Sequence, residues 1–348
     1  QVTGLTSSEV AALTTTQLGA LSSTQIGALT ISAQSGLSTT DVVALKTSQI
    51  QGLTSAQVAA LTVTQLGALS SSQIGALTSD SVQGLNINQM STAQVAGLTS
   101  VQVAALATTQ IGALSSGQLG ILTSVQIGAL STSQVRALSS SQIGALSSSA
   151  IQGLTTADVA SLASSQIVGL TTAEVAALTT AQFASMTSGN LVALTTTQVG
   201  ALSSSQIGAL TTTQIGALSS SQISALTTVA EAGLTTLDLA SLTPTQIAGL
   251  RSNQIGALSS AQIGALSSTQ ISALTSAAIP GFTTAQVSAL STTQVKGLIS
   301  SEISALSTTQ IRSMSQAQIA AISASAMPGF TTAQLNALTT TQVAGLTA

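Results

Sequence analysis

The chain has 348 residues, of which 44% are hydrophobic and only 4% are charged, and its net charge is −3. It contains no histidine and no cysteine, so the usual imidazole base, thiol nucleophile and zinc ligands are missing. The scarcity of basic and aromatic side chains argues against nucleic-acid binding. No apolar run approaches the roughly 20 residues needed to span a bilayer, so we also expect no membrane span.

A unit of eight residues repeats along the chain, as in Leu138–Ala145 (Leu-Ser-Ser-Ser-Gln-Ile-Gly-Ala). With the leucine as position 1, units begin every eight residues from Leu5 to Leu85 and again from Met90 to Leu346. Positions 1 and 6 are apolar, positions 2 to 4 are mainly Ser or Thr, position 5 is mainly Gln, and position 8 is small. The sequence therefore predicts one repeated structural element.

This element is predicted to be a short helix that begins at position 3 and ends near position 7 or 8. Position 6 and the next position 1 are three residues apart, which places them on one face of a helix. Ser or Thr at position 2 with Gln at position 5 is the capping-box pattern. Pro244 lies at position 3, the first helical residue, where the missing N–H costs nothing.

The few charges also favour helices, because acids stabilise a helix N-terminus and bases a C-terminus. Three of the five bases, Arg136, Lys296 and Arg312, lie at position 7. Six of the eight acids lie at position 5: Glu9, Asp41, Asp158, Glu174, Asp238 and Glu302.

One continuous helix is excluded, because eight residues per unit would rotate the apolar stripe by roughly 80° each time. We therefore predict an all-α solenoid with one helix per unit, two units per coil, and positions 1, 6 and 8 in the core. The alternative is a β-solenoid with stacked Gln ladders, favoured by Thr, Ile and Val and by the frequent Gly at position 7.

In chain order, the first irregular unit is Leu29–Gly36, where we expect Ile31 to supply a missing apolar contact. A phase break follows at residues 85–90, where a kink or local loop is predicted. We expect residues 1–348 to form a single continuous repeat array, and to be a window of a longer chain because neither end has a capping repeat.

A longer period, six octads in length, overlies the basic repeat and is compatible with three coils of two units or two coils of three, of which we expect the first. It marks units that lose the position 5 Gln and end in Gly, and it reflects either a lateral contact or duplication history. Proline at position 7 in two of them, Pro280 and Pro328, is expected to end the helix early. These units begin at Leu29, Leu77, Leu226, Leu274 and Ile322.

Candidate catalytic chemistry is weak throughout. A nucleophilic Ser would need a base, and only Lys46, Lys296 and scattered acids are available. Asp158 and Glu174, two octads apart, would stack on adjacent coils of two units, but they offer too few oxygens for calcium. Glu231 replaces Ile at position 6, where we expect a register shift with Val229 taking the core position. We predict no catalytic, cofactor-binding or metal-binding residues, and no enzyme.

The Leu-Ser/Thr-x-x-Gln-Ile/Val-x-Ala octads resemble the tandem-repeat regions of very large exported or cell-surface proteins of bacteria, including adhesin-like ones. The resemblance covers the whole chain and implies an extracellular structural role. We therefore expect a fibre, filament or adhesin stalk, located outside the cell or on its surface, that associates with itself through an uncharged Ser/Thr/Gln surface. The alternative is a module that binds glycans or another surface, such as ice.

Overall fold

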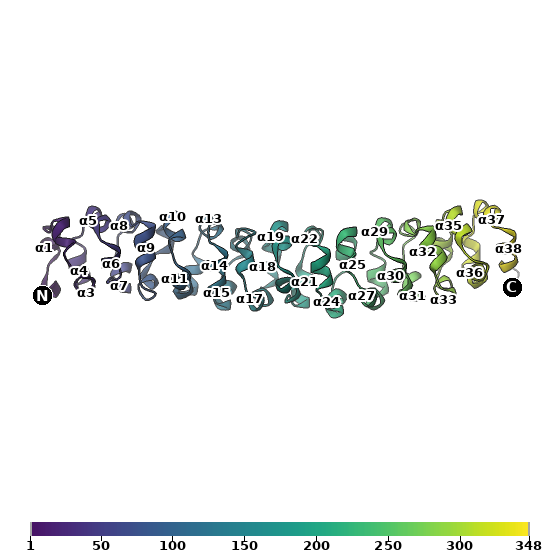
Figure 1. Cartoon of the computed structure of the whole chain (residues 1–348), viewed down its shortest axis with the longest axis horizontal. Helices are drawn as coiled ribbons and strands as arrows, with labels where there is room; N and C mark the ends of the chain where they lie inside the picture. Colours follow the sequence, from purple (N-terminus) through teal and green to yellow (C-terminus); the bar gives the residue numbers. More distant parts are fainter. Residues whose placement is uncertain (1, 347–348) are drawn as a thin grey trace. The chain divides into compact units, whose positions relative to one another are not determined.

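The computed structural model describes residues 2–346, and the chain divides into two compact halves, residues 1–178 and 179–348. Each half is an α-solenoid of short helices joined by extended links (Figure 1). Among the described residues there are 38 α-helices of four to seven residues, six 3-10 helices and no strand. The all-α prediction is confirmed, and the β-solenoid alternative is wrong.

The first half, residues 1–178, contains helices α1 to α19 and the 3-10 helices η1 to η4. Their bounds are η1 Val2–Gly4, α1 Ser7–Ala11, α2 Thr15–Leu18, α3 Ser23–Gly27, α4 Ile31–Gln34, α5 Thr39–Ala44, α6 Thr47–Ile50, α7 Ser55–Ala59, α8 Val63–Ala68, α9 Ser71–Ala76, η2 Ser81–Gly84, η3 Ile87–Gln89, α10 Thr92–Ala96, α11 Ser100–Ala105, α12 Thr108–Gly112, α13 Ser116–Gly120, α14 Ser124–Gly128, α15 Thr132–Arg136, α16 Ser140–Ile143, η4 Ile151–Gly153, α17 Thr156–Ser161, α18 Ser164–Gly169 and α19 Thr172–Ala177.

The second half, residues 179–348, contains helices α20 to α38 and the 3-10 helices η5 and η6. Their bounds are α20 Thr180–Ala184, α21 Ser188–Ala193, α22 Thr196–Val199, α23 Ser204–Gly208, α24 Thr212–Gly216, α25 Ser220–Ala225, α26 Thr228–Glu231, α27 Thr236–Ser241, α28 Pro244–Ile247, α29 Ser252–Ala257, α30 Ser260–Gly264, α31 Ser268–Ile271, η5 Ile279–Gly281, α32 Thr284–Ala289, α33 Thr292–Val295, α34 Ser300–Ala305, α35 Thr308–Ser313, α36 Gln316–Ala321, η6 Met327–Gly329, α37 Thr332–Ala337 and α38 Thr340–Leu346.

The helices begin where the capping signals predict. In α23, for example, Ser203 at position 2 is the N-cap and its side chain accepts from the backbone N–H of Gln206. Pro244 is the first residue of α28, as expected. The prolines Pro280 and Pro328 lie in η5 and η6, where a 3-10 turn replaces the α-helix. Local signals thus determine the start of each element.

The core contains the apolar side chains of positions 1 and 6. Leu138 is 3% exposed and Ile143 is fully buried, and nearly every unit repeats this pair. Position 8, expected in the core, is mostly half-buried or exposed. Position 5 takes its place, because Gln side chains such as Gln57, 2% exposed, are buried. The interior is therefore not entirely apolar.

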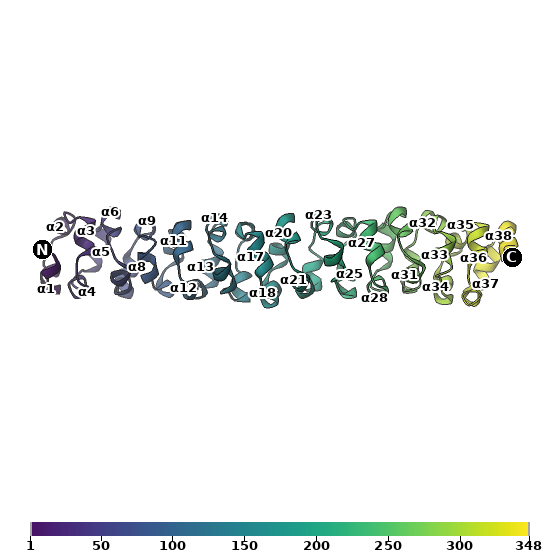
Figure 2. The same ribbon diagram turned by 90° about the horizontal axis from the view of Figure 1, so that it is seen from below.

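Helices that contact one another are three elements apart in the chain, such as α1 with α4 and α32 with α35. Figure 2 shows α1 and α4 side by side at the start of the first half of the chain. The prediction of two units per coil is wrong. Stacked helices are three octads apart, so each coil contains three octads. Gln side chains reach 28 and 31 residues back because they extend from position 5 of one octad to position 1 three octads earlier and to position 6 four octads earlier. Three octads surround the apolar side chains, which two layers would leave open at the sides.

Units without the position 5 Gln have their own packing. Six of them have Ala or Ser there and Gly at position 8, and a Cβ built on that Gly would lie 1.9–2.2 Å from the carbonyl oxygen of a Ser three octad units earlier. Only Gly fits so close an approach. Units that keep Gln at position 5 but end in Gly, such as the one ending in Gly52, make the same contact, so the close approach follows the Gly at position 8. The glycines of the six units without Gln are Gly36, Gly84, Gly153, Gly233, Gly281 and Gly329.

The phase break at residues 85–90 keeps the core continuous. Instead of a loop, Ile87–Gln89 forms the 3-10 helix η3, and Ile87 and Met90 are buried as a position 6 and position 1 pair. In the other irregular unit, Ile31 is 51% exposed while Ala33 and Gln34 are buried, so its expected core contact is wrong. Among residues 2–346, no helix has the length and apolar character to cross a membrane.

Candidate functional site: a buried ladder of glutamines

The chemical feature that recurs along the chain is the position 5 glutamine. At Gln57 the side-chain oxygen Oε1 accepts from the backbone N–H of the N-cap Thr54 at 2.8 Å. The backbone N–H of Gln57 in turn donates to Thr54 Oγ1 at 3.2 Å. These reciprocal bonds form a capping box, and they satisfy two N–H groups that a helix start leaves free.

The other end of the same amide joins two coils. Gln57 Nε2 donates to the carbonyl oxygens of Ile26 and Leu29, both at 2.9 Å. In the second half of the chain, Gln286 Nε2 donates to the carbonyl oxygen of Ile255 at 2.9 Å and to that of Leu258 at 2.6 Å. Each of these glutamines therefore holds its own helix start and two carbonyls of the preceding coil. The sequence showed the first of these roles and gave no sign of the second.

This ladder continues across the phase break. Gln102 Nε2 donates to Ile74 and Leu77, which are 28 and 25 residues earlier instead of 31 and 28. The three-residue difference equals the deletion in the short unit, so the coils stay in register. In the short unit Ile87 takes position 6, so Asn86 precedes it in place of a Gln.

Where aspartate replaces glutamine, its carboxylate finds other donors. Asp158 Oδ2 accepts from the backbone N–H of Thr155 at 2.9 Å and from its hydroxyl at 2.6 Å. Asp158 Oδ1 accepts from the hydroxyl of Thr132, on the neighbouring helix α15, at 2.8 Å. Asp238 repeats the arrangement with Thr235 and Thr212. These buried aspartates therefore have hydrogen-bond donors for both carboxyl oxygens.

Where glutamate replaces glutamine, one oxygen is left alone. Glu302 Oε2 accepts from the backbone N–H of Ile299 at 2.8 Å, and Glu174 Oε2 accepts from Thr171 at 2.6 Å. The Oε1 atoms of both residues are buried without a hydrogen-bond partner. Burial raises the pKa of Glu174, and it raises the pKa of Glu302 to about 7. By contrast Glu9, in the exposed first helix, has its pKa lowered by the backbone N–H of Thr6.

Glu231 is a third buried glutamate, at position 6. It is 1% exposed, neither carboxylate oxygen has a partner, and burial raises its pKa to about 7. Val229 is 70% exposed, so the predicted register shift is wrong. Asp158 and Glu174 lie on α17 and α19, two elements apart, whereas contacting helices are three apart, so their expected stacking is also wrong.

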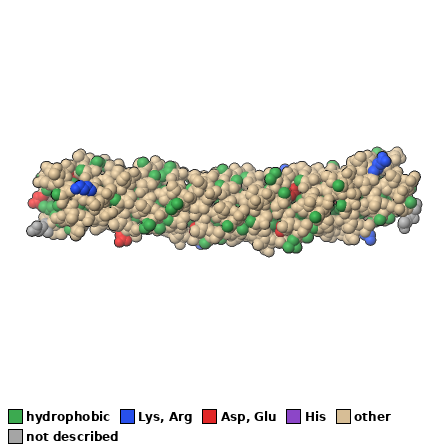
Figure 3. Space-filling model, viewed as in Figure 1, with side chains coloured by type: hydrophobic (Ala, Val, Ile, Leu, Met, Phe, Trp, Pro, Cys, Tyr) green, Lys and Arg blue, Asp and Glu red, His purple; other side chains and the backbone are tan. Residues whose placement is uncertain are grey.

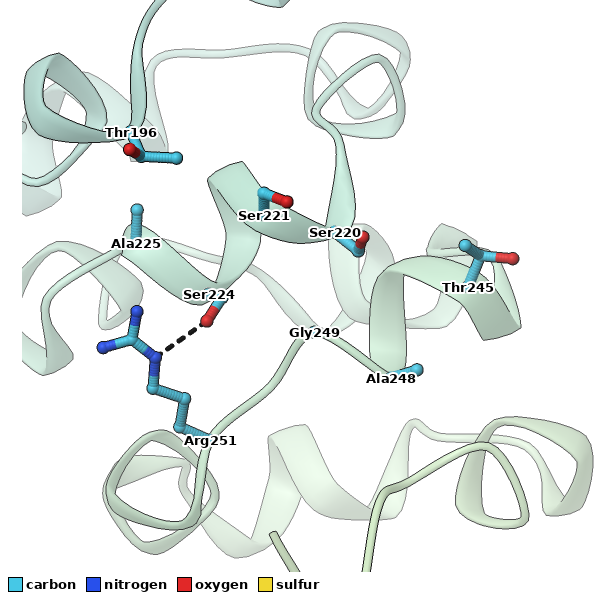
Figure 4. Close-up of a pocket in the computed structure, with 9 residues that line it drawn as sticks. All are labelled: Thr196, Ser220, Ser221, Ser224, Ala225, Thr245, Ala248, Gly249 and Arg251. Carbon is cyan, nitrogen blue, oxygen red and sulfur yellow. Dashed lines mark hydrogen bonds between the residues drawn. The ribbon is translucent and has the colours of Figure 1, made fainter. Parts of the chain in front are cut away.

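Two basic residues at position 2 lie beside surface hollows. Arg251 Nε donates to the hydroxyl of Ser224 at 2.7 Å, and Lys46 Nζ donates to the carbonyl oxygen of Gly19 at 3.0 Å. The hollow at Arg251, about 580 Å³, is shown in Figure 4, where the side chain of Arg251 points toward Ser224. It offers hydroxyls and one guanidinium and contains no side chain that could act as a general base. Its lining residues are Thr196, Ser220, Ser221, Ser224, Ala225, Thr245, Ala248, Gly249 and Arg251.

The other bases lie near helix ends, as predicted: Arg136 and Arg312 in last turns and Lys296 at a C-cap. Within the described residues, no three acidic side chains come together as a metal site would require. The arrangement thus offers polar bonding and mechanical coupling between coils.

Comparison with known proteins identifies the repeat. A family model described as the ALTTAQ repeat matches more than half of the chain in ten segments. No curated protein sequence matches the chain. The matched segments are residues 1–31, 35–71, 104–132, 111–148, 122–156, 151–188, 175–212, 191–228, 232–268 and 267–300.

Among solved structures, the chain is similar to the leucine-rich repeat-containing protein LegL7 from Legionella pneumophila. The two are 12% identical, the match covers 68% of this chain and 79% of that one, and the TM-score is 0.20. A similarity this low carries no argument about fold or function.

Proposed function

Because the chain belongs to the ALTTAQ-repeat family, we propose that it is a structural repeat protein that forms or supports a fibre, filament or adhesin stalk. The observation that carries the proposal is the buried ladder itself. Within each half of the chain, Gln amides bond coils to the coils before them, and Leu and Ile side chains fill the interior between them. Such a repeat gains stability from every added neighbour and is suited to bearing load along its length.

The surface supports self-association as the second part of the proposal. Only isolated charges lie on the face shown in Figure 3, and because most Gln side chains are buried, its uncharged polar side chains are mainly Ser and Thr. With so little charge, copies of the chain do not repel one another strongly when they approach side by side. Exposed apolar residues add adhesive points, among them Val101 and Val125 on the contacting helices α11 and α14.

Electron microscopy and analytical ultracentrifugation of the purified chain test this function. We expect filaments or laterally associated particles whose formation increases with concentration. Because few charges are involved, raising the salt concentration from 0.05 to 1 M, which cuts the screening length to roughly 3 Å, should not dissolve them. A variant with Val101→Glu and Val125→Glu should associate less, and Ser133→Thr serves as the control. Monodisperse monomers at every concentration would contradict the proposal.

The proposed location is outside the cell or on its surface, and it is based on the resemblance of the octads to exported bacterial repeat regions. Cell fractionation followed by immunogold labelling of intact producing cells tests it. Labelling confined to the cytoplasm would contradict it.

A second candidate function is glycan binding, for which the hydroxyl-lined hollow beside Arg251 is the supporting observation. A glycan array with the purified chain tests it, with Arg251→Ala as the matched variant. Binding that the variant loses would favour this function. Absence of binding leaves the structural role as the better proposal.

A further inference from the structure

The position 5 glutamates occupy places that elsewhere hold a hydrogen-bond donor. Gln286 and Gln318, at position 5 before and after Glu302 in the chain, direct Nε2 at carbonyl oxygens 28 and 31 residues earlier. Glu302 Oε2 makes the N-cap bond that Gln Oε1 makes elsewhere. Its remaining oxygen, Oε1, is buried without a partner. From the equivalence of the units we infer that Oε1 lies where Nε2 lies in the Gln units, beside the carbonyl oxygens 28 and 31 residues earlier, which here belong to Leu274 and Ile271.

Three oxygens cannot meet in this way unless one of them carries a proton, because a carboxylate and a carbonyl are both acceptors. The amides of Gln286 and Gln318, two octads before and after Glu302, lie 2.6–2.9 Å from their carbonyl oxygens. An O–H···O bond has a similar length, so a protonated oxygen fits the same place.

We propose that Glu302 is folded as a neutral carboxylic acid whose O–H donates to the carbonyl of Leu274 or Ile271, and that its ionisation loosens this coil of the solenoid. The neutral acid is then the closest chemical match to the glutamine amide that the other coils use. Glu174, in the first half of the chain, has the same arrangement of one bonded and one unpartnered oxygen.

No other charge competes for this role. Helix α34 packs against η5 (Ile279–Gly281) and η6 (Met327–Gly329), neither of which contains a titratable residue. The carboxyl is fully buried, and its pKa is raised by burial to about 7, with a smaller opposing effect of the Ile299 N–H. Its titration therefore depends on the fold and not on a neighbouring base.

The direction of the pH effect follows from comparing the folded and unfolded states. Unfolded, Glu302 has its ordinary pKa of 4.5, and folded, its pKa is about 7. The folded state holds the proton more tightly, so the stabilisation is complete below pH 4.5 and is lost as the pH rises to 7 and above. The coil that contains Glu302 is thus more stable in mild acid than in mild alkali. This effect does not depend on the proposed extracellular role.

Hydrogen exchange of the intact chain at pH 4.5 and pH 8 tests the proposal, with Glu302→Gln as the variant. Comparing the two proteins at one pH cancels the intrinsic pH dependence of exchange, and also cancels any contribution from Glu231. We expect the amides of α34 to exchange roughly tenfold or more slowly in the variant at pH 8, and to differ by less than about twofold at pH 4.5.

Asp238→Asn is the matched control, because Asp238 also lies at position 5 but has donors for both oxygens. It should give no slowing of exchange in α27 at pH 8. A carbon-13 titration of the glutamate carboxyls, assigned with Glu302→Gln, reads the protonation directly. Equal exchange of wild type and Glu302→Gln at pH 8, or a Glu302 carboxyl that titrates near pH 4.5 in the folded chain, would overturn the proposal.

Discussion

Two consecutive units of the second half, Leu274–Gly281 and Phe282–Ala289, show two ways of joining coils. The second uses Gln286, whose amide bonds the N-cap Thr283 and two carbonyls of the preceding coil. The first has buried Ala278 instead, and its Gly281 lies so close to Ser252 that an added Cβ would meet the carbonyl oxygen at 1.9 Å. One joint is bridged by a side chain and the other is direct backbone contact.

The difference teaches that the amide bridge at position 5 and the close contact at position 8 are separate ways of joining coils. Every unit with Ala or Ser at position 5 has Gly at position 8, whereas units with Gln at position 5 mostly have either Ala or Gly there. Ser81 is an intermediate case, since its hydroxyl donates directly to the Leu53 carbonyl, 28 residues earlier, and Gly84 follows at position 8. Some Gln units, such as the one ending in Gly52, also make the close contact.

The largest expected effect comes from removing the bridge. Gln286→Ala leaves the buried carbonyls of Ile255 and Leu258 without their partner, and each buried unpaired group costs about 1–3 kcal/mol, so we expect a loss of about 3 kcal/mol. Urea unfolding followed by far-UV circular dichroism measures it. Adding Ala289→Gly should recover part of the loss by allowing a direct joint. If the double variant is no more stable than Gln286→Ala, a direct joint cannot replace the bridge.

The starts of the helices could be predicted from the sequence because their causes are local. Thr6 with Glu9 and Thr243 with Pro244 carry complete instructions for a helix start within four residues. The size of the coil could not be predicted, because it depends on contacts between sequentially distant units that no single octad records. The second bond of each Gln was missed for the same reason.

The glutamates also show where sequence reasoning stopped. Glu302 and Asp158 both fit a capping box, so both were interpreted as helix-capping acids. They differ only by one methylene, yet Asp158 reaches the Thr132 hydroxyl while Glu302 extends into a place for a donor. One signal was available in the sequence: each of the six units without Gln that end in Gly has a Ser at position 3 of the unit three before it.

Breaking the direct joint should have the next largest effect. Gly281→Ala places a methyl group against the Ser252 carbonyl, and overpacking of this kind costs about 1–3 kcal/mol, so we expect about 2 kcal/mol. Gly264→Ala is the matched control in the same half, because a Cβ there meets nothing within 4 Å. It should stabilise the helix by about 0.5–1 kcal/mol. Equal unfolding midpoints for the two variants would show that the close approach carries no cost.

The smallest expected effect sharpens the division of labour within a capping box. In α12, Ala107 occupies the N-cap, so Gln110 still accepts from the Ala107 N–H at 2.9 Å while no hydroxyl caps the first turn. Ala107→Thr should restore that bond and stabilise the chain by about 0.5–1 kcal/mol. Thr109→Ser, on the same helix but with no capping role, should change the urea midpoint by less. If Ala107→Thr gives no gain, the amide bridge alone determines the start of α12, and the hydroxyls at position 2 matter less to the fold than their abundance suggests.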